Sequence, residues 1–271
     1  MKKPQKSRRT ANVKTARQAE QPDAASGQRV STSSASSLFG HMDGGVLLLV
    51  RMMQFGDSTL PIGAFAFSNA LESAVQKGIV RDAQDLQDYT ACAIEQAATS
   101  DAIGLAWAMR YAAQDAWDDL VMVDHEVHCR RLPEESRLMS VRMGKKLVEM
   151  CLSTTGLSGL DVWLGRINAH ETPGTYPVSL GLLFSRMGLP VQQALVVHQY
   201  GLAATILNAA LRLMRVTHLD TQRILFRLME NLDRQCAVAS SAPLESMSSY
   251  APMSEILGAV HVKAHVRMFM N

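Results

Sequence analysis

The chain has 271 residues, of which 47% are hydrophobic and 6% aromatic, and it carries a formal net charge of +2. This length can bury a sizeable core without disulfides or metals. The apolar stretch near the start, Val46 to Val50, is far shorter than the roughly 20 residues that cross a bilayer. Four scattered cysteines without a C-x-x-C pair indicate reduced, mostly buried thiols in a cytoplasmic protein. We therefore expect neither a disulfide scaffold nor a membrane protein.

The charge is distributed unevenly along the chain. Residues 1–40 hold eight Lys and Arg residues against Glu20 and Asp23, a local charge of +6, which leaves 2 − 6 = −4 for residues 41–271. The first segment is also rich in Ser, Ala and Gln and lacks helical periodicity. Residues 1–42 are therefore predicted to form a disordered basic extension, and residues 43–271 a single domain. Such an extension is usually solvated. Contact with nucleic acid or an acidic partner is one alternative, and an organellar transit peptide is another, which the acidic residues and the Lys-rich start fit poorly.

Composition and periodicity predict an all-α fold for the domain. Met, Ala and Leu are abundant, and no run of alternating β-branched residues is long enough to indicate a sheet. We expect a single-domain bundle of about eight to ten helices. The expected helices cover residues 46–55, 64–77, 83–98, 102–113, 116–131, 134–152, 176–187, 191–216 and 220–238, with a last helical or extended segment over 255–269.

Cap residues and loops separate these helices. Asp82 and Asp220 are expected to be N-caps, and Gly78 stands where a C-cap glycine is expected. Residues 153–174 are rich in Ser, Thr and Gly, and they are predicted to form a loop with one helical turn around Trp163. Residues 240–254 contain two prolines and are predicted to form a second loop.

The most informative segment is the stretch from Ser58 to Glu72. Pro61 fixes its own backbone and Gly63 permits angles that other residues avoid, so a rigid turn is expected before a helix. Phe65 and Phe67 would point to different sides of that helix, so at least one is expected to be exposed as an interface anchor, unless both pack in the core. The segment has no acid–base pair, metal-ligand set or phosphate loop, which favours docking or packing over catalysis.

This segment resembles the signature of the UreF family of urease accessory proteins, which reads approximately L-P-I-G-G-F-(S/A)-(Y/F)-S-x-G-L-E. The chain departs from it at Ala64 and Ala70, where the family has Gly, and both departures remove backbone freedom but no chemical group. The matching residues are Leu60, Pro61, Ile62, Gly63, Phe65, Phe67, Ser68, Leu71 and Glu72.

Three further blocks follow in the family's order. Glu135-x-Arg137-x-x-Ser140-x-x-Met143-Gly144 is similar to the family's E-x-R-x-x-S-x-x-M-G helix. Leu211-Arg212-Leu213 with Asp220-Thr221-Gln222 is similar to its R-L…D-x-Q block. His261, Arg267 and Phe269 match its closing H-E-x-x-x-x-R-L-F, with Val262 and Met268 as departures. The resemblance covers residues from about 47 to 271.

The resemblance implies a helical homodimer that is not an enzyme and needs no cofactor of its own. Family members bind the accessory protein UreD (also called UreH), recruit the GTPase UreG and act on the urease apoprotein, where they support GTP-dependent nickel insertion. The 60–72 segment would contact a partner, Arg212 and Gln222 the dimer or GTPase surface, and a tail from about residue 240 to 271 would bind UreD. The implied partner-binding residues are Leu60, Pro61, Gly63, Phe65, Phe67, Ser68, Glu72, Glu135, Gly144, Arg212, Gln222, Pro252, His261, Arg267 and Phe269.

Other classes of protein stay open. His125, His128 and Cys129 share one helix face and could bind a transition metal as a carrier protein would, although Asp124 and Glu126 suggest a solvated polar face instead. His261 and His265, four residues apart, could likewise form a weak metal clip. A nucleic-acid-binding protein that uses residues 1–40 is a third class. Neither a G-x-S-x-G elbow nor a G-x-x-x-x-G-K-(S/T) loop is present, so catalysis and nucleotide hydrolysis are not expected.

Overall fold

A computed structural model describes residues 45–262 and 267–270 of the chain. Every regular element in these residues is helical, which confirms the all-α prediction. Residues 1–44, for which the basic extension is predicted, lie outside the described part, as do residues 263–266 with His265. The α-helices are α1 (Gly45–Gly56), α2 (Leu71–Gln76), α3 (Ala83–Thr99), α4 (Asp101–Ala113), α5 (Trp117–Cys129), α6 (Glu134–Thr155), α7 (Leu160–Asn168), α8 (Tyr176–Arg186), α9 (Val191–Leu213), α10 (His218–Met229), α11 (Leu232–Ser241) and α12 (Pro252–His261).

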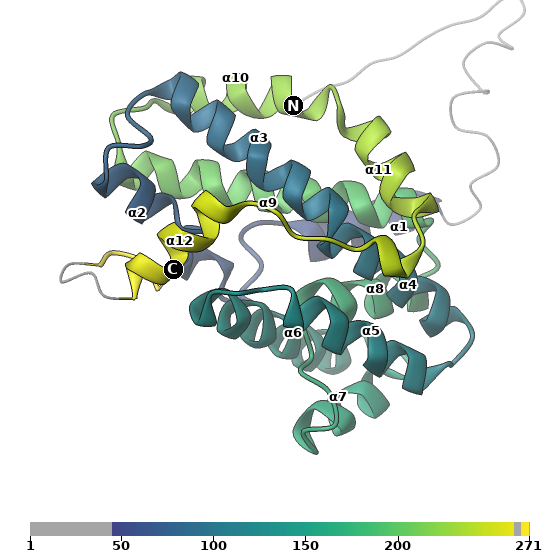
Figure 1. Cartoon of the computed structure of the whole chain (residues 1–271). Helices are drawn as coiled ribbons and strands as arrows, with labels where there is room; N and C mark the ends of the chain where they lie inside the picture. Colours follow the sequence, from purple (N-terminus) through teal and green to yellow (C-terminus); the bar gives the residue numbers. More distant parts are fainter. Residues whose placement is uncertain (1–44, 263–266, 271) are drawn as a thin grey trace, which may run out of the picture. The chain divides into compact units, whose positions relative to one another are not determined.

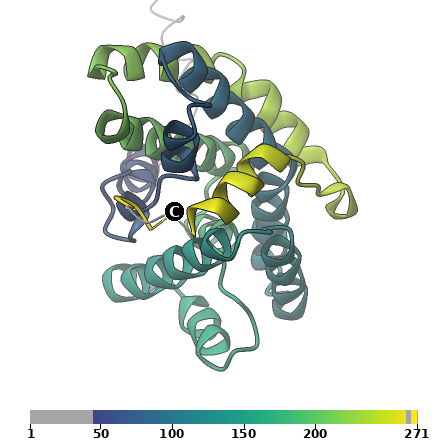
Figure 2. The same cartoon turned by 60° about the vertical axis from the view of Figure 1, so that its left-hand side comes forward.

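The helices of this domain form two groups that share the long helix α9. In Figure 1, α3, α9, α10 and α11 lie above α5, α6, α7 and α8, and Figure 2 shows the same order after a turn of the molecule. In both views α12 runs between the two groups, and it contacts α2 and α6. The last helix therefore lies where the upper and lower groups meet.

Helix α9 belongs to the core along its length. Ala194 and Leu195 are buried in one hydrophobic cluster with α4, α6 and α8, whereas Ile206 and Leu207 are buried in a second with α2, α3 and α10. Among the described helices, α9 is long and apolar enough to cross a membrane by length and composition, but 61% of that stretch is buried inside the protein. Its apolar sequence is explained by its central position.

The predicted helix over 64–77 is wrong, because the chain breaks it in the middle. A short 3-10 helix covers Ala64–Ala66, and α2 begins only at Leu71. Between them, Asn69 and Ala70 adopt left-handed conformations with φ of 53° and 63°. Two consecutive residues of this kind cannot continue a right-handed helix. After α2, Gly78 has φ 67°, which confirms it as the residue that ends the helix.

Two other predicted segments differ from the structure. Residues 220–238 form two helices instead of one, since α10 ends at Met229 and α11 begins at Leu232. Thr217 is the N-cap of α10, and Asp220 completes a capping box by accepting the Thr217 backbone N–H, so the N-cap prediction for Asp220 is wrong. The predicted 153–174 loop contains α7, a nine-residue helix.

Burial explains α7 and corrects the expectation for the cysteines. Trp163 of α7 is fully buried, and its indole N–H lies 3.2 Å from the hydroxyl oxygen of Ser179 in α8. This anchor fixes a helix that lies within a segment rich in Ser, Thr and Gly. Cys92 and Cys129 are exposed, so only Cys151 and Cys236 are the buried thiols that the sequence predicted.

Candidate functional site

The turn that runs from Gly63 to the start of α2 presents the ring of Phe65 to the surface and buries the ring of Phe67. Gly63 has φ 93°, a left-handed conformation, and its carbonyl accepts the backbone N–H of Ala66. Phe65 is 71% exposed, whereas Phe67 is only 4% exposed. The prediction that at least one of these rings lies on the surface is confirmed.

Arg212, at the end of α9, joins this turn to the C-terminal segment. Its guanidinium carbon lies 4.0 Å from the ring centroid of Phe65 and 4.0 Å from that of Phe269. It also donates to the backbone carbonyl of Phe65 across 3.2 Å. Cation–π contacts on both sides hold the guanidinium between two family-motif residues that are about 200 positions apart in the sequence.

The C-terminal segment 267–270 is bound to the same turn through its backbone. The N–H groups of Met268 and Phe269 donate to the two carboxylate oxygens of Glu72 across 2.7 and 3.0 Å. The N–H of Met270 donates to the carbonyl of Ala66 across 2.8 Å. Glu72 is buried at the start of α2, so it supplies both acceptors from inside the domain.

Four side chains connect the C-terminal segment to α2 and α6 through hydrogen bonds and ion pairs. We call these residues, Glu72, Glu135, His261 and Arg267, the latch. His261, the last residue of α12, is fully buried; its Nε2 lies 3.0 Å from Glu72 Oε2 and its Nδ1 lies 2.9 Å from Glu135 Oε2. Arg267 Nη1 donates to Glu135 Oε1 across 2.5 Å. Elements from three parts of the sequence thus meet through paired charges.

Glu72 is ionised in this environment. Burial alone would raise its pKa, but the backbone N–H of Met268, the imidazole of His261 and the backbone N–H of Phe269 together hold the pKa below its ordinary value. The latch is a hydrogen-bonded chain with His261 in the middle. Among the described residues no three His, Cys, Asp or Glu side chains are grouped so that they could hold a metal ion.

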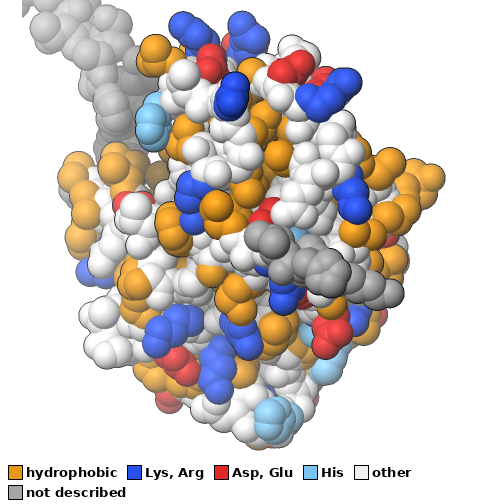
Figure 3. Space-filling view, turned by 90° about the vertical axis from the view of Figure 1, so that its left-hand side faces the viewer, with side chains coloured by type: hydrophobic (Ala, Val, Ile, Leu, Met, Phe, Trp, Pro, Cys, Tyr) orange, Lys and Arg blue, Asp and Glu red, His pale blue; other side chains and the backbone are white. Residues whose placement is uncertain are grey.

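An apolar rim surrounds the latch on the outer surface, and we define the rim as Phe65, Leu138, Met268 and Met270. Their exposed fractions are 71%, 42%, 61% and 45%. Leu138, Met268 and Met270 line a shallow depression together with Phe67, Glu135, Arg267 and Phe269. Figure 3 looks at the side of the molecule that carries the C-terminus, where hydrophobic and basic side chains are interspersed.

The remaining predicted residues lie elsewhere. Leu60 and Pro61 precede the turn, and Pro252 is the exposed first residue of α12. Gly144 is buried in α6, where a Cβ would come within 2.1 Å of the Gly174 carbonyl oxygen, so it allows close packing. Gln222 is exposed on α10, away from the latch contacts. Of the predicted residues, the structure brings together those of the turn, Glu135, Arg212 and the tail.

The metal-carrier hypothesis gains no support from the geometry. His125 Nε2 lies 3.2 Å from the carbonyl oxygen of Glu171, and burial lowers the pKa of His128. On the described part of the chain, no three His, Cys, Asp or Glu side chains form a possible metal site, either at the latch or on the α5 face that carries Cys129. The predicted metal clip of His261 and His265 is not tested, because His265 lies outside the described residues.

Asp124 is a buried polar centre that the sequence reasoning misassigned. It was expected on a solvated face, but it is fully buried and its carboxylate accepts the Thr172 hydroxyl at 2.6 Å, the Gly174 N–H at 2.5 Å and the Thr175 N–H at 2.8 Å. A usable signal existed, because Leu120, Val123 and Val127 place Asp124 within the apolar face of α5. Asp124 thus fixes the loop that leads into α8.

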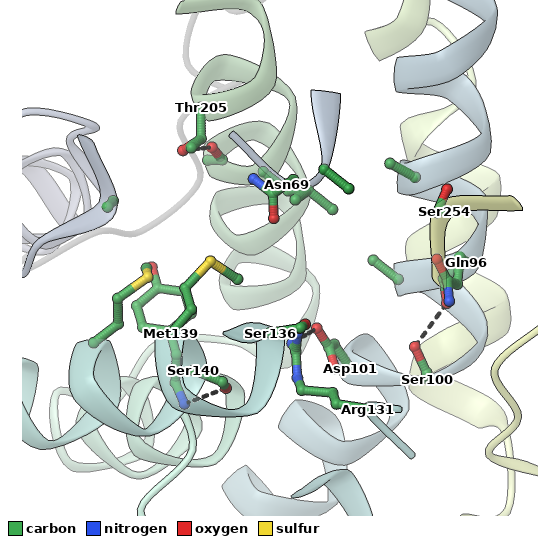
Figure 4. A pocket seen from close by; sticks show the side chains of 18 of the residues that line it. Asn69, Gln96, Ser100, Asp101, Arg131, Ser136, Met139, Ser140, Thr205 and Ser254 are labelled. Carbon is green, nitrogen blue, oxygen red and sulfur yellow. Dashed lines mark hydrogen bonds and ion pairs between the residues drawn. The ribbon is translucent and has the colours of Figure 1, made fainter. Parts of the chain in front are cut away.

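A second polar site lines a partly open pocket of about 180 Å³ between the turn, α3, α4, α6, α9 and α12. Asp101, Arg131 and Ser136 lie together on one side of it (Figure 4), and Arg131 donates to both Asp101 and Ser136. His198 of α9 is also part of the lining, and burial lowers its pKa, so the ring is neutral near pH 7. Sequence reasoning did not find this site, because its residues are far apart in the chain and match no motif.

Comparison with known proteins agrees with the motif blocks. Residues 80–229 match the family model described as UreF. Over 223 residues the chain is 48% identical to the Urease accessory protein UreF of Yersinia enterocolitica serotype O:8 / biotype 1B, which covers 82% of this chain and 98% of that protein. The same identity and coverage relate it to proteins of this name from Yersinia pestis (strain Pestoides F) and Yersinia pseudotuberculosis serotype I (strain IP32953).

Proposed function

The chain belongs to the UreF family of urease accessory proteins, as its motifs predicted, and on this basis we propose that it is a non-catalytic scaffold for nickel insertion into urease. In this role it binds UreD (UreH) and the GTPase UreG, and it holds them on the urease apoprotein while nickel passes to the active site. It works in the cytoplasm as a homodimer. Nickel is the cargo of the assembly, and this chain contributes surfaces to it.

The observation that carries the proposal is the convergence of family-motif residues at one site beside the exposed rim. The turn, the start of α6, the end of α9 and the C-terminal segment meet through Glu72, Glu135, Arg212, His261 and Phe269. These contacts fix the backbone but leave the rim exposed. A rigid apolar rim with basic neighbours has the composition of a protein–protein interface.

We assign the rim to UreD, because the family resemblance places UreD on the C-terminal tail. Met268 and Met270 are held by backbone hydrogen bonds, so their side chains are presented without the entropic cost of ordering a free segment. A separate exposed apolar face on α10 contains Leu219 and Phe226 beside Gln222. We assign that face to the dimer contact or to UreG.

A single exposed ring tests the assignment of the rim. Phe65→Ser removes the most exposed rim side chain, and because Phe65 contributes little to the core, we expect the fold to persist while capture of UreD falls at least tenfold. The measurement is the affinity of purified variant for purified UreD, alongside urease activation in cells that carry the nickel accessory genes.

A matched control uses the other exposed phenylalanine. Phe226 on α10 is exposed to a similar degree, so Phe226→Ser makes the same chemical change away from the rim. It should leave UreD capture unchanged. Wild-type affinity of Phe65→Ser for UreD would refute the assignment of the rim, and urease activation that proceeds normally without this chain would refute the function itself.

A further inference from the structure

The C-terminal segment is held closed by charges that balance. The latch has two carboxylates, Glu72 and Glu135, and two basic groups, Arg267 and His261. Arg267 is always charged, whereas the charge of a histidine depends on a proton that it gains or loses near neutral pH. The net charge of the four latch side chains therefore depends on the protonation of His261.

The geometry around His261 indicates which form it takes. Its Nε2 lies 3.0 Å from Glu72 Oε2 and its Nδ1 lies 2.9 Å from Glu135 Oε2, so both ring nitrogens face carboxylate oxygens. A neutral imidazole has an N–H on one nitrogen only, and its other nitrogen would direct a lone pair at a carboxylate. An imidazolium donates from both. Its position in the last turn of α12 also favours a positive charge.

We propose that the latch is proton-linked: the C-terminal segment is closed while His261 is an imidazolium, and it loosens when the ring loses its proton. Among the described residues, the charged groups that face the ring are Glu72 from α2, Glu135 from α6 and Arg267, which shares Glu135. Without the proton, the buried carboxylate of Glu72 and the partly buried carboxylate of Glu135 would be opposed by one cation. Unbalanced buried charge is costly, so the closed form becomes less populated.

Opening the latch has two structural consequences. Ser254, Glu255 and Gly258 of α12 form part of the wall of the pocket, so movement of α12 would widen it. Met268 and Met270 belong to the rim, so the rim would lose its fixed backbone. Only the second consequence rests on the proposed function, since the latch itself is a property of the single chain.

At acid pH the latch is expected to loosen as the pH falls rather than as it rises, because Glu72 is then the group that changes its protonation. Its pKa is held below the ordinary value of 4.5, so its stabilising contribution is present above 4.5 and is lost as the pH falls through the lowered pKa. The proposal therefore predicts that the segment loosens at acid pH as well as on loss of the His261 proton.

Hydrogen exchange of the tail amides tests the proposal on the full chain without any partner. The amides of Met268, Phe269 and Met270 are hydrogen-bonded in the closed form. We would measure their protection by mass spectrometry from pH 6 to 9, relative to a free peptide of residues 252–271 at each pH. Once His261 loses its proton, protection should fall by up to about tenfold per pH unit, while α8 amides stay protected.

Two substitutions separate proton linkage from a purely structural role. In Glu135→Gln, the amide N–H can donate to an unprotonated Nδ1, so the latch should close without the extra proton and its protection should become independent of pH. In His261→Gln, protection should be low and equally flat. His218→Gln, which changes a histidine outside the latch at the start of α10, should keep the wild-type profile.

The outcome that overturns the proposal is tail protection in the wild type that does not change between pH 6 and 9. A pH dependence that survives in Glu135→Gln, or that disappears in His218→Gln, would also overturn it. None of these results bears on UreD capture by the rim, which the Phe65 comparison tests independently.

Discussion

At the scale of single residues, the structure depends most on polar groups that are buried with all their partners. Asp124 on α5 and Glu72 on α2 each accept backbone N–H groups of a segment distant in sequence, and each fixes a chain segment that has no regular structure of its own. Such acceptors are expensive to disturb, because donors that lose their partner stay buried. The two carboxylates therefore have larger effects than any exposed ion pair.

Asp124→Asn tests this at one position. The amide keeps the shape of the carboxylate but directs an N–H₂ group at donors from Gly174 and Thr175, so we expect a loss of about 3 kcal/mol in the free energy of unfolding. Denaturant titration followed by circular dichroism measures it. Asp118→Asn is the control: it changes a highly exposed carboxylate on the same helix that pairs with Arg166, and it should cost less than about 1 kcal/mol. Equal midpoints for the two variants would contradict this account of Asp124.

At the scale of elements, the sequence predicted long periodic helices well and broken segments poorly. The expected helices near 102–113, 134–152 and 191–216 correspond to α4, α6 and α9 because their apolar spacing is set by core packing. The break at Asn69 and Ala70 was missed, since Ala normally favours helix and its left-handed conformation is imposed by tertiary contacts. Helix α7 was predicted only as a single turn around Trp163, because the segment that surrounds it is rich in Ser, Thr and Gly.

The candidate site was predictable in its members and not in its geometry. Family motifs named Phe65, Glu72, Glu135, His261 and Phe269, but spacing along the chain carries no information about which of them touch. The acceptor role of Glu72 toward the Met268 and Phe269 backbone has no sequence signal, because every residue type offers the same N–H. The pocket residues Asp101 and Arg131 pair across 30 positions and match no local pattern.

The turn before α2 offers a test at this scale. Gly63 has φ 93° and an added Cβ would meet no atom within 4 Å, so Gly63→Ala changes only the backbone preference and should destabilise the protein by about 1–2 kcal/mol. Gly165→Ala is the matched control, because it also meets open space but lies inside the helix α7, where it should stabilise by about 1 kcal/mol. Thermal unfolding of both variants measures the difference, and shifts of the same sign would contradict the assigned role of the turn.

At the scale of the whole domain, α9 joins the two hydrophobic clusters. The first contains α4, α6 and α8, the second contains α2, α3, α10 and the tail residues Leu257 and Phe269, and α9 contributes buried side chains to both. A change in one cluster should therefore be felt in the other through this helix. Phe269 of the C-terminal segment is buried in the second cluster. The packing of this segment against the domain therefore belongs to the same cooperative unit.

Ile206→Ala measures this coupling, since Ile206 is fully buried on α9 within the second cluster. Removing its side chain should cost about 3 kcal/mol of unfolding free energy. The three tryptophans, Trp107, Trp117 and Trp163, all lie in or against the first cluster, so their fluorescence reports on the half of the domain that the substitution does not touch. If α9 couples the halves, fluorescence and circular dichroism will show one transition with the same lowered midpoint, whereas Val238→Ala at an exposed position will leave it in place. A fluorescence midpoint that stays at the wild-type value while helicity is lost earlier would mean that the clusters unfold independently.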